Sequence, residues 1–333
     1  MKIINENIKE KRFKRSYLLC GQEDYLKRQY KEKLKDAVTG GDDMNYSYYE
    51  GKQIDIKEVI DTCETLPFFA EFRLVVMENT GFFKSACDDA LVEYVKNIPD
   101  YLTIVFVESE VDKRSRLYKA VSQNGYISEM KVQEDAVLKK WIVSLLTAQQ
   151  KKMDGRTLEQ FLEYTGSSMD NIYQELEKLV CYTMGREVIT RGDLEQVCTV
   201  TTVNKIFDMV SAVAQKRQRE ALDLYYDLLT LKEPPMRILY LLSRQFNLIL
   251  QVKDLLAQGY QSASIAKKMG VQGFVAAKCQ KQAEYFTTAG LREALEECAS
   301  FEEAVKTGRL SDKMCVELII IKYSQRQENE YGK

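Results

Sequence analysis

Thr103-Ile-Val-Phe-Val107 is the best candidate for a buried strand in this sequence, because five β-branched or aromatic residues follow one another between Pro99 and a polar segment. An uninterrupted run of this kind is typical of a strand that is covered on both faces, as in a parallel sheet. Shorter β-rich runs precede it and are separated by helical stretches; they lie at residues 16–21, 44–49 and 73–77. The first 130 residues therefore predict parallel strands with covering helices, an α/β layer of the nucleotide-binding type.

The pattern changes after Trp141, where the apolar residues take a helical period that continues to the end of the chain. Leu158, Phe161 and Leu162 mark one such helix. Pro234-Pro235 precedes a long helix that is apolar around much of its circumference and is therefore expected to be buried on several sides. We predict three domains: an α/β domain without a functional P-loop at residues 1–140, a small helical domain at 141–210 and an all-helical domain at 211–333.

Composition limits the possible functions. The 333 residues include no histidine, which excludes Ser-His-Asp and Cys-His catalysis, histidine-ligated zinc and the usual general base near neutral pH. The eight cysteines include no pair at the close spacing of zinc ribbons or redox motifs, so we predict small, reduced core residues and no metal site. A formal net charge of −2 does not indicate a nucleic-acid-binding protein.

The sequence also predicts a location. The amino terminus, residues 1–16, is charged throughout and lacks the apolar core of a signal peptide. The longest apolar stretches are too short to cross a bilayer. We expect a cytoplasmic protein without a membrane partner.

A strand, turn and helix at the start of an α/β domain is where a P-loop would lie, with the pattern glycine, four residues, glycine, lysine, and serine or threonine. Of the two glycines only the first remains here, as Gly21. Glu23 and Asp24 place two negative charges where phosphates need backbone donors and a positive field. The strand at 73–77 continues into Glu78-Asn79, which is not the acidic pair that holds magnesium. We predict no catalysis, no cofactor and a degenerate P-loop at Gly21, Gln22, Glu23 and Asp24.

The residues alone leave open that this is an ordinary α/β domain unrelated to ATPases. Further stretches follow one another in order over nearly the whole chain, at residues 17–26, 66–78, 106–119, 166–179, 204–208, 237–246, 265–270 and 305–308. No single stretch is specific, but their order and spacing together resemble the delta-subunit family of the bacterial DNA polymerase III holoenzyme.

This resemblance implies a degenerate AAA+ module, which consists of a parallel-sheet P-loop-type domain and a small helical lid domain, followed by a helical collar domain for oligomerisation. It implies a non-hydrolysing subunit of a nucleotidyltransferase complex, with the motor (gamma/tau) subunits, the delta-prime subunit and primed DNA as partners. The implied function is to bind and open the sliding clamp, the beta subunit, during DNA replication. The chain departs from the family at Gly273, where relatives often have proline, and no DNA-contacting residue can be carried over.

In this family the clamp is held by a helix end and a hydrophobic pair just before a strand, which correspond here to Leu66, Pro67, Phe68 and Phe69. A proline stops a helix, and the residues after it can lie on an exposed turn from which two rings project. The pattern alone favours a different interpretation, in which the phenylalanine pair belongs to the core at the start of a strand. Leu66 and Phe72 fit inward packing equally well.

Two other functions stay open. A divergent AAA+ ATPase that uses unconventional residues predicts nucleotide turnover by the isolated protein. A standalone DNA-binding scaffold predicts tight, salt-dependent association with DNA in the absence of other subunits. The basic stretches at 9–15 and 262–278 are candidates for such contact, but interleaved acidic residues and the lack of a dimer signal favour a solvated surface and ordinary helix packing.

Overall fold

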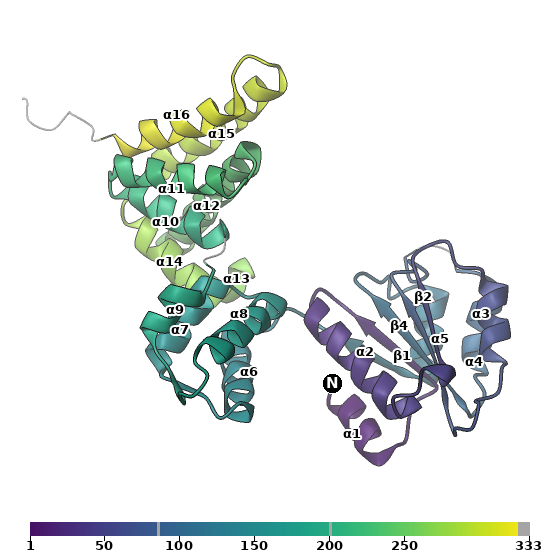
Figure 1. The fold of residues 1–333 in the computed structure, drawn as a ribbon. Helices are drawn as coiled ribbons and strands as arrows, with labels where there is room; N and C mark the ends of the chain where they lie inside the picture. Colours follow the sequence, from purple (N-terminus) through teal and green to yellow (C-terminus); the bar gives the residue numbers. More distant parts are fainter. Residues whose placement is uncertain (85–86, 200–201, 326–333) are drawn as a thin grey trace, which may run out of the picture. The chain divides into compact units, whose positions relative to one another are not determined.

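The computed structural model describes residues 1–84, 87–199 and 202–325 (Figure 1). The chain divides into two compact units. The N-terminal unit comprises Met1–Gln133 together with Ser168–Asp170, and the C-terminal unit comprises Glu134–Ser167 and the chain from Asn171 onward. The division into three domains stays a prediction. In the described part of the chain, no helix is long and apolar enough to cross a membrane.

A five-stranded parallel sheet in the order β2-β3-β4-β1-β5 forms the centre of the N-terminal unit. Every residue of β1 and β4 is buried, as expected for strands that are covered on both faces. The strand predicted at residues 103–107 is thus the central strand of the sheet. The strands are β1 (Ser16–Cys20), β2 (Tyr46–Glu50), β3 (Arg73–Glu78), β4 (Leu102–Glu108) and β5 (Tyr126–Glu129).

Helices cover both faces of this sheet. Alternate residues of the central strands, such as Leu18, Val75 and Phe106, form one hydrophobic cluster with α3, α4 and α5. Helix α2 packs against β1, β3 and β4 on the other face (Figure 1). The helices are α1 (Lys2–Glu10), α2 (Asp24–Thr39), α3 (Ile56–Cys63), α4 (Asp89–Lys96) and α5 (Arg116–Asn124), and a short 3-10 turn, η1 (Asp43–Asn45), precedes β2.

Parallel pairing separates the two candidate sites. In a parallel sheet the amino ends of all strands lie at one edge and the carboxyl ends at the other. Tyr46 pairs with Leu74, so the residues just before β2 and just before β3 are neighbours at the amino edge. Gly21 follows β1 and therefore lies at the carboxyl edge. The phenylalanine pair and the degenerate P-loop thus occupy opposite edges of the sheet.

The C-terminal unit is helical apart from two paired strands of two residues each, β6 (Lys152–Met153) and β7 (Val188–Ile189), which the sequence did not predict. Helix α12 packs against α10, α14, α15 and α16, so the prediction of a long helix buried on several sides is confirmed. The helices are α6 (Asp135–Ala148), α7 (Gly155–Thr165), α8 (Met169–Tyr182), α9 (Arg191–Val197), α10 (Thr202–Ala214), α11 (Gln218–Thr230), α12 (Pro235–Ala257), α13 (Ser262–Met269), α14 (Gly273–Ala283), α15 (Thr288–Lys306) and α16 (Asp312–Ser324).

All eight cysteines are free thiols, and their burial differs from the prediction at three positions, since Cys87 and Cys198 are only partly buried and Cys181 is not buried at all. Cys181 is exposed, because it lies near the end of α8 on a side of the helix that faces solvent. The buried ones are Cys20, Cys63, Cys279, Cys298 and Cys315.

Gly125 provides a test of the close packing between α5 and β1. A Cβ at this position would collide with the hydroxyl and the backbone carbonyl of Ser16. We expect Gly125→Ala to lower the free energy of unfolding by about 1–3 kcal/mol or more, because overpacking forces the backbone to move. Gly155→Ala is the control, since a Cβ there meets no atom within 4 Å. Urea denaturation measures both, and equal midpoints for Gly125→Ala and the wild type would contradict this account of the packing.

Candidate functional site

An exposed hydrophobic cluster lies on the connection between α3 and β3. Phe69 is 95% exposed, Leu66 69% and Phe68 51%, whereas Pro67 is half-buried. The rings of Phe68 and Phe69 lie edge to face with their centroids 4.5 Å apart. The alternative interpretation, in which the pair belongs to the core, is wrong: both rings project from the folded unit. An apolar cluster that folding leaves in water is typical of a binding surface.

The sequence explains why the chain leaves the helix here. Asp55 caps α3 by accepting a hydrogen bond from the backbone N–H of Lys57, and the helix ends at Cys63. The helix thus ends before it reaches Pro67, the proline that the sequence analysis expects to stop it. The residue before a proline disfavours helical backbone angles, so Leu66 and Pro67 exclude a further turn. The following residues cross to β3 without joining a helix or a strand.

The two residues whose direction the sequence left open have different positions. The Phe72 ring is partly buried and packs edge to face on Phe13, with centroids 5.5 Å apart. Leu66 points into solvent together with the phenylalanine pair. The exposed cluster therefore comprises Leu66, Phe68 and Phe69, and Phe72 anchors the segment to the unit.

Asn45 holds this segment and was missed by the sequence analysis. Its side-chain Oδ1 accepts a hydrogen bond from the Phe68 backbone N–H at 2.6 Å, and its Nδ2 donates to the Phe68 carbonyl at 2.9 Å. Asn45 is fully buried. The distance in sequence between the two residues gives no local signal for this contact; only the pairing of β2 with β3 brings them together.

The loop that follows β1, where the sequence predicts a degenerate P-loop, is held by backbone hydrogen bonds to Glu108 and Met130. The N–H of Gly21 donates to the Glu108 carbonyl at 3.2 Å, and the N–H of Glu23 donates to the Met130 carbonyl at 3.1 Å. Gly21 has a φ of 121° and lies so close to Met130 that a Cβ would collide with the Met130 carbonyl. Two of the backbone donors that a P-loop directs at phosphates are therefore engaged within the protein.

Lys27 stands at the lysine position of the P-loop pattern, counted from Gly21, and the sequence analysis overlooked it. The spacing alone could have revealed it. Its side chain is buried, and Nζ lies 2.8 Å from Oδ1 of Asp24 and 3.0 Å from Oγ of Ser109. Arg28 replaces the serine or threonine of the pattern. The cation is thus paired with an acidic residue of the same loop.

Other carboxylates at this edge are also engaged. Burial raises the pKa of the Glu23 carboxyl to about 7, so this side chain favours the neutral form more than an exposed glutamate does. Glu78 Oε2 lies 2.6 Å from Nζ of Lys31. The buried Glu108 accepts hydrogen bonds from the backbone and hydroxyl of Thr80. In the described residues, no group of three metal-ligating side chains is found.

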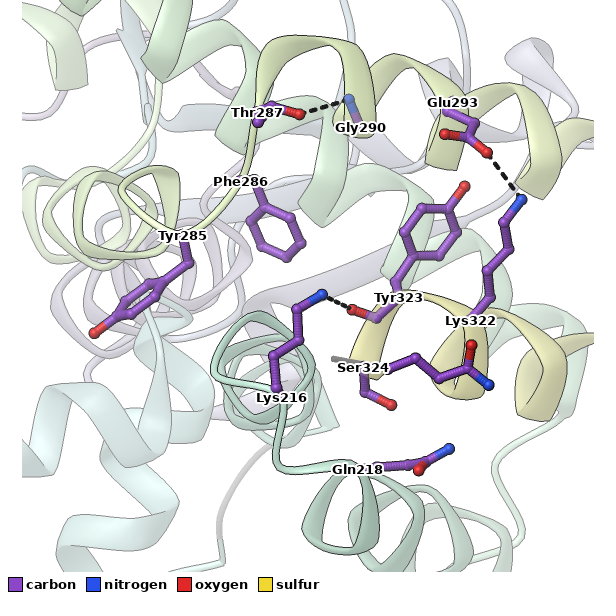
Figure 2. A pocket seen from close by; sticks show the side chains of 11 residues that line it. Lys216, Gln218, Tyr285, Phe286, Thr287, Gly290, Glu293, Lys322, Tyr323 and Ser324 are labelled. Carbon is purple, nitrogen blue, oxygen red and sulfur yellow. Dashed lines mark hydrogen bonds and ion pairs between the residues drawn. The ribbon is translucent and has the colours of Figure 1, made fainter. Parts of the chain in front are cut away.

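The C-terminal unit contains a cavity of about 1250 Å³, which is lined by α15, α16 and the connections that precede α11 and α15 (Figure 2). Its lysines already have partners. Lys216 donates to the Tyr323 carbonyl at 2.9 Å, and burial lowers the pKa of its ammonium. Lys322 lies 2.9 Å from Glu293, whose hydrogen bond raises the lysine pKa. The cavity therefore presents aromatic and amide groups with little uncompensated charge.

Two family models match the chain. One, described as DNA polymerase III, delta subunit, matches residues 17–131, and the other, described as DNA polymerase III delta subunit, C-terminal domain, matches residues 203–323. The chain is 28% identical to DNA polymerase III subunit delta of Bacillus subtilis (strain 168), over 94% of this chain and 93% of that relative. It is 22% identical to probable DNA polymerase III subunit delta of Aquifex aeolicus (strain VF5), over 78% of this chain and 76% of that relative.

A solved structure agrees with these matches. The Bacillus subtilis DNA clamp loader delta protein (YqeN) superimposes with a TM-score of 0.66 at 27% identity, and the match covers 98% of this chain and 99% of that structure. The predicted fold, a parallel-sheet α/β unit followed by a helical region, is confirmed, and the assignment of that unit to a degenerate AAA+ module stays a prediction. The chain belongs to the delta-subunit family of DNA polymerase III.

Proposed function

We propose that this chain binds the sliding clamp, the beta subunit, and opens it for loading onto primed DNA during replication. The exposed cluster of Leu66, Phe68 and Phe69 carries the proposal, because it offers a partner a large apolar area at the edge of a rigid sheet. Fully burying each ring would contribute about 1.5–3 kcal/mol. Aromatic anchors of this kind dominate the binding energy of interfaces. The solved relative that is named as a DNA clamp loader delta protein supports the assignment.

The proposed mechanism is mechanical. The rings of Phe68 and Phe69, with Leu66 and Pro67 beside them, insert into an apolar pocket next to the clamp's subunit interface. Binding opens the ring only if the cluster has a higher affinity for the open form than for the closed form. The motor (gamma/tau) subunits supply ATP hydrolysis, and the delta-prime subunit and primed DNA complete the assembly. We place this assembly in the cytoplasm.

We propose further that the chain has no catalytic function of its own within the polymerase complex. The engaged donors of the loop at Gly21 and the pairing of Lys27 with Asp24 support this, because an incoming phosphate would have to displace contacts within the protein. A divergent ATPase and a standalone DNA-binding scaffold remain the alternatives. Thermal melting with nucleotide and titration with DNA separate them from the clamp-binding function.

The double variant Phe68→Ala/Phe69→Ala tests the clamp contact. If each buried ring contributes about 1.5–3 kcal/mol, the affinity for the sliding clamp of the same organism falls by about 100-fold or more, since about 1.4 kcal/mol corresponds to tenfold. The melting temperature should change little, because both rings are exposed in the free chain. Titration calorimetry with the purified clamp measures the affinity.

Tyr240→Ala is the matched control, since Tyr240 is also an aromatic residue and is 65% exposed, but lies on α12 of the other unit. It should bind the clamp like the wild type. Absence of binding by the wild type would remove the clamp assignment. Equal binding by the double variant and the wild type would keep the partner and place the contact elsewhere.

Added nucleotide tests the degenerate P-loop. We expect magnesium and ATP to leave the melting temperature of the isolated protein unchanged and phosphate release to stay at background, for the wild type and for Lys27→Ala alike. The divergent-ATPase alternative predicts that ATP stabilises the wild type by mass action and that Lys27→Ala loses this effect. Thermal melts with and without nucleotide distinguish the two.

A matching titration with labelled duplex DNA at two salt concentrations tests the scaffold alternative. Tight binding that weakens steeply with added salt would support that alternative. The clamp-loader proposal predicts weak binding by the isolated chain.

A further inference from the structure

We infer that Asn45 is a positioning residue for the proposed clamp contact, because its buried amide fixes the Phe68 backbone and so presets the two exposed rings. The inference rests on the proposed function, which it deepens by naming the residue that holds the cluster in its binding geometry. Asn45 itself is buried and would not touch the clamp. Its role would be exerted through Phe68.

The contact resembles one step of strand pairing. The Asn45 side chain accepts from the N–H of Phe68 at 2.6 Å and donates to its carbonyl at 2.9 Å, so both backbone groups of a single residue are paired. An asparagine amide has the donor and the acceptor for this at the required separation. Aspartate lacks the donor, and glutamine is longer by one methylene group.

The amide is itself fixed by the sheet. Asn45 ends η1 and directly precedes β2, whose first residue, Tyr46, pairs with Leu74 of β3. Asp42 fixes the turn by accepting a hydrogen bond from the Met44 N–H at 2.9 Å. The backbone position of Asn45 is therefore set by residues that do not belong to the exposed cluster.

The connection has few other attachments. Among the residues from 66 to 72, all of which the structure describes, Phe68 makes hydrogen bonds, and both go to Asn45. Phe72 adds its ring contact with Phe13. Leu66, Phe69 and the two residues that follow Phe69 are exposed. Without the Asn45 amide, the exposed cluster would be joined to the sheet by its two ends and one ring contact.

The backbone conformation of Phe69 brings the two rings together, and the Asn45 side-chain amide holds the residue that precedes it. Successive side chains of an extended segment point to opposite sides, yet the rings of Phe68 and Phe69 are 4.5 Å apart. A φ of 48° at Phe69 turns the second ring toward the first. A bulky residue with positive φ is uncommon and persists where the surroundings fix it. If Phe68 is released from Asn45, the segment can adopt several backbone conformations, and clamp binding must order it again.

Hydrogen exchange of the wild-type protein gives the first test and needs no variant. We expect the Phe68 amide to be protected and those of Phe69 and Ala70 to exchange rapidly. Asn45→Ala should raise the Phe68 exchange rate by about 100-fold or more while the amides of β4 keep their protection, and Asn45→Asp, which keeps the acceptor and loses only the donor, should raise it less. A purely structural role would instead raise the exchange of Phe68 and β4 together.

Clamp affinity is measured on the same proteins. We expect Asn45→Ala and Asn45→Asp to weaken clamp binding by about tenfold or more although both rings are present, because binding must then order the segment. Thr39→Val is the control. Thr39 is also a buried polar residue of this unit, and its hydroxyl donates to the Lys35 carbonyl. The variant lacks this hydroxyl and should bind the clamp like the wild type.

The outcomes separate the two claims. Wild-type affinity in folded Asn45 variants with an unprotected Phe68 amide would overturn the inference and leave the clamp function intact. An unprotected Phe68 amide in the wild type would overturn the inference without any variant. Failure of the wild type to bind the clamp would overturn the proposed function, and with it the clamp role of Asn45.

Discussion

Burial of both faces of β4 is the constraint on which the N-terminal unit depends. A strand of this kind must have neighbours on each side and helices above and below, and the parallel pairing requires every connection to return through a helix to the opposite edge. The chain therefore reaches β3 through α3 and a crossing segment at the amino edge of the sheet. The loop after β1 lies at the carboxyl edge. The exposed phenylalanine pair and the loop at Gly21 are thus separated by the full length of the strands.

The sequence predicts the parts that depend on long apolar patterns. The run at 103–107, the helical period after Trp141 and the long buried α12 all have periodicities that identify them without tertiary information. Strands β6 and β7, of two residues each, are too short to give a pattern. The change to a helical period after Trp141 lies inside α6, because a change of periodicity becomes visible only some residues after the chain has entered a helix.

In the candidate site, too, the sequence predicts features that depend on local patterns and misses those that depend on contacts between distant residues. Pro67 and the paired rings predict a turn with two projecting side chains, but the pattern cannot decide between core and surface, and only the resemblance to a family led to the correct choice. Asn45 was missed because its contact with Phe68 depends on the pairing of β2 with β3. Lys27 was missed although its spacing from Gly21 was visible. Its pairing with Asp24 and Ser109, which separates a closed loop from an open phosphate site, required the structure.

The two edges of the sheet differ in which of their groups already have partners within the protein. At the carboxyl edge, backbone donors, a lysine and buried carboxylates make hydrogen bonds and ion pairs within the protein. At the amino edge, the rings of Phe68 and Phe69 are exposed to solvent. The most direct test of this account is photo-crosslinking from a benzophenone amino acid placed at Phe69, with the same group at Tyr240 for comparison. The account predicts a crosslink to the sliding clamp from position 69 and none from position 240. Crosslinks to the clamp from position 240 alone would contradict it.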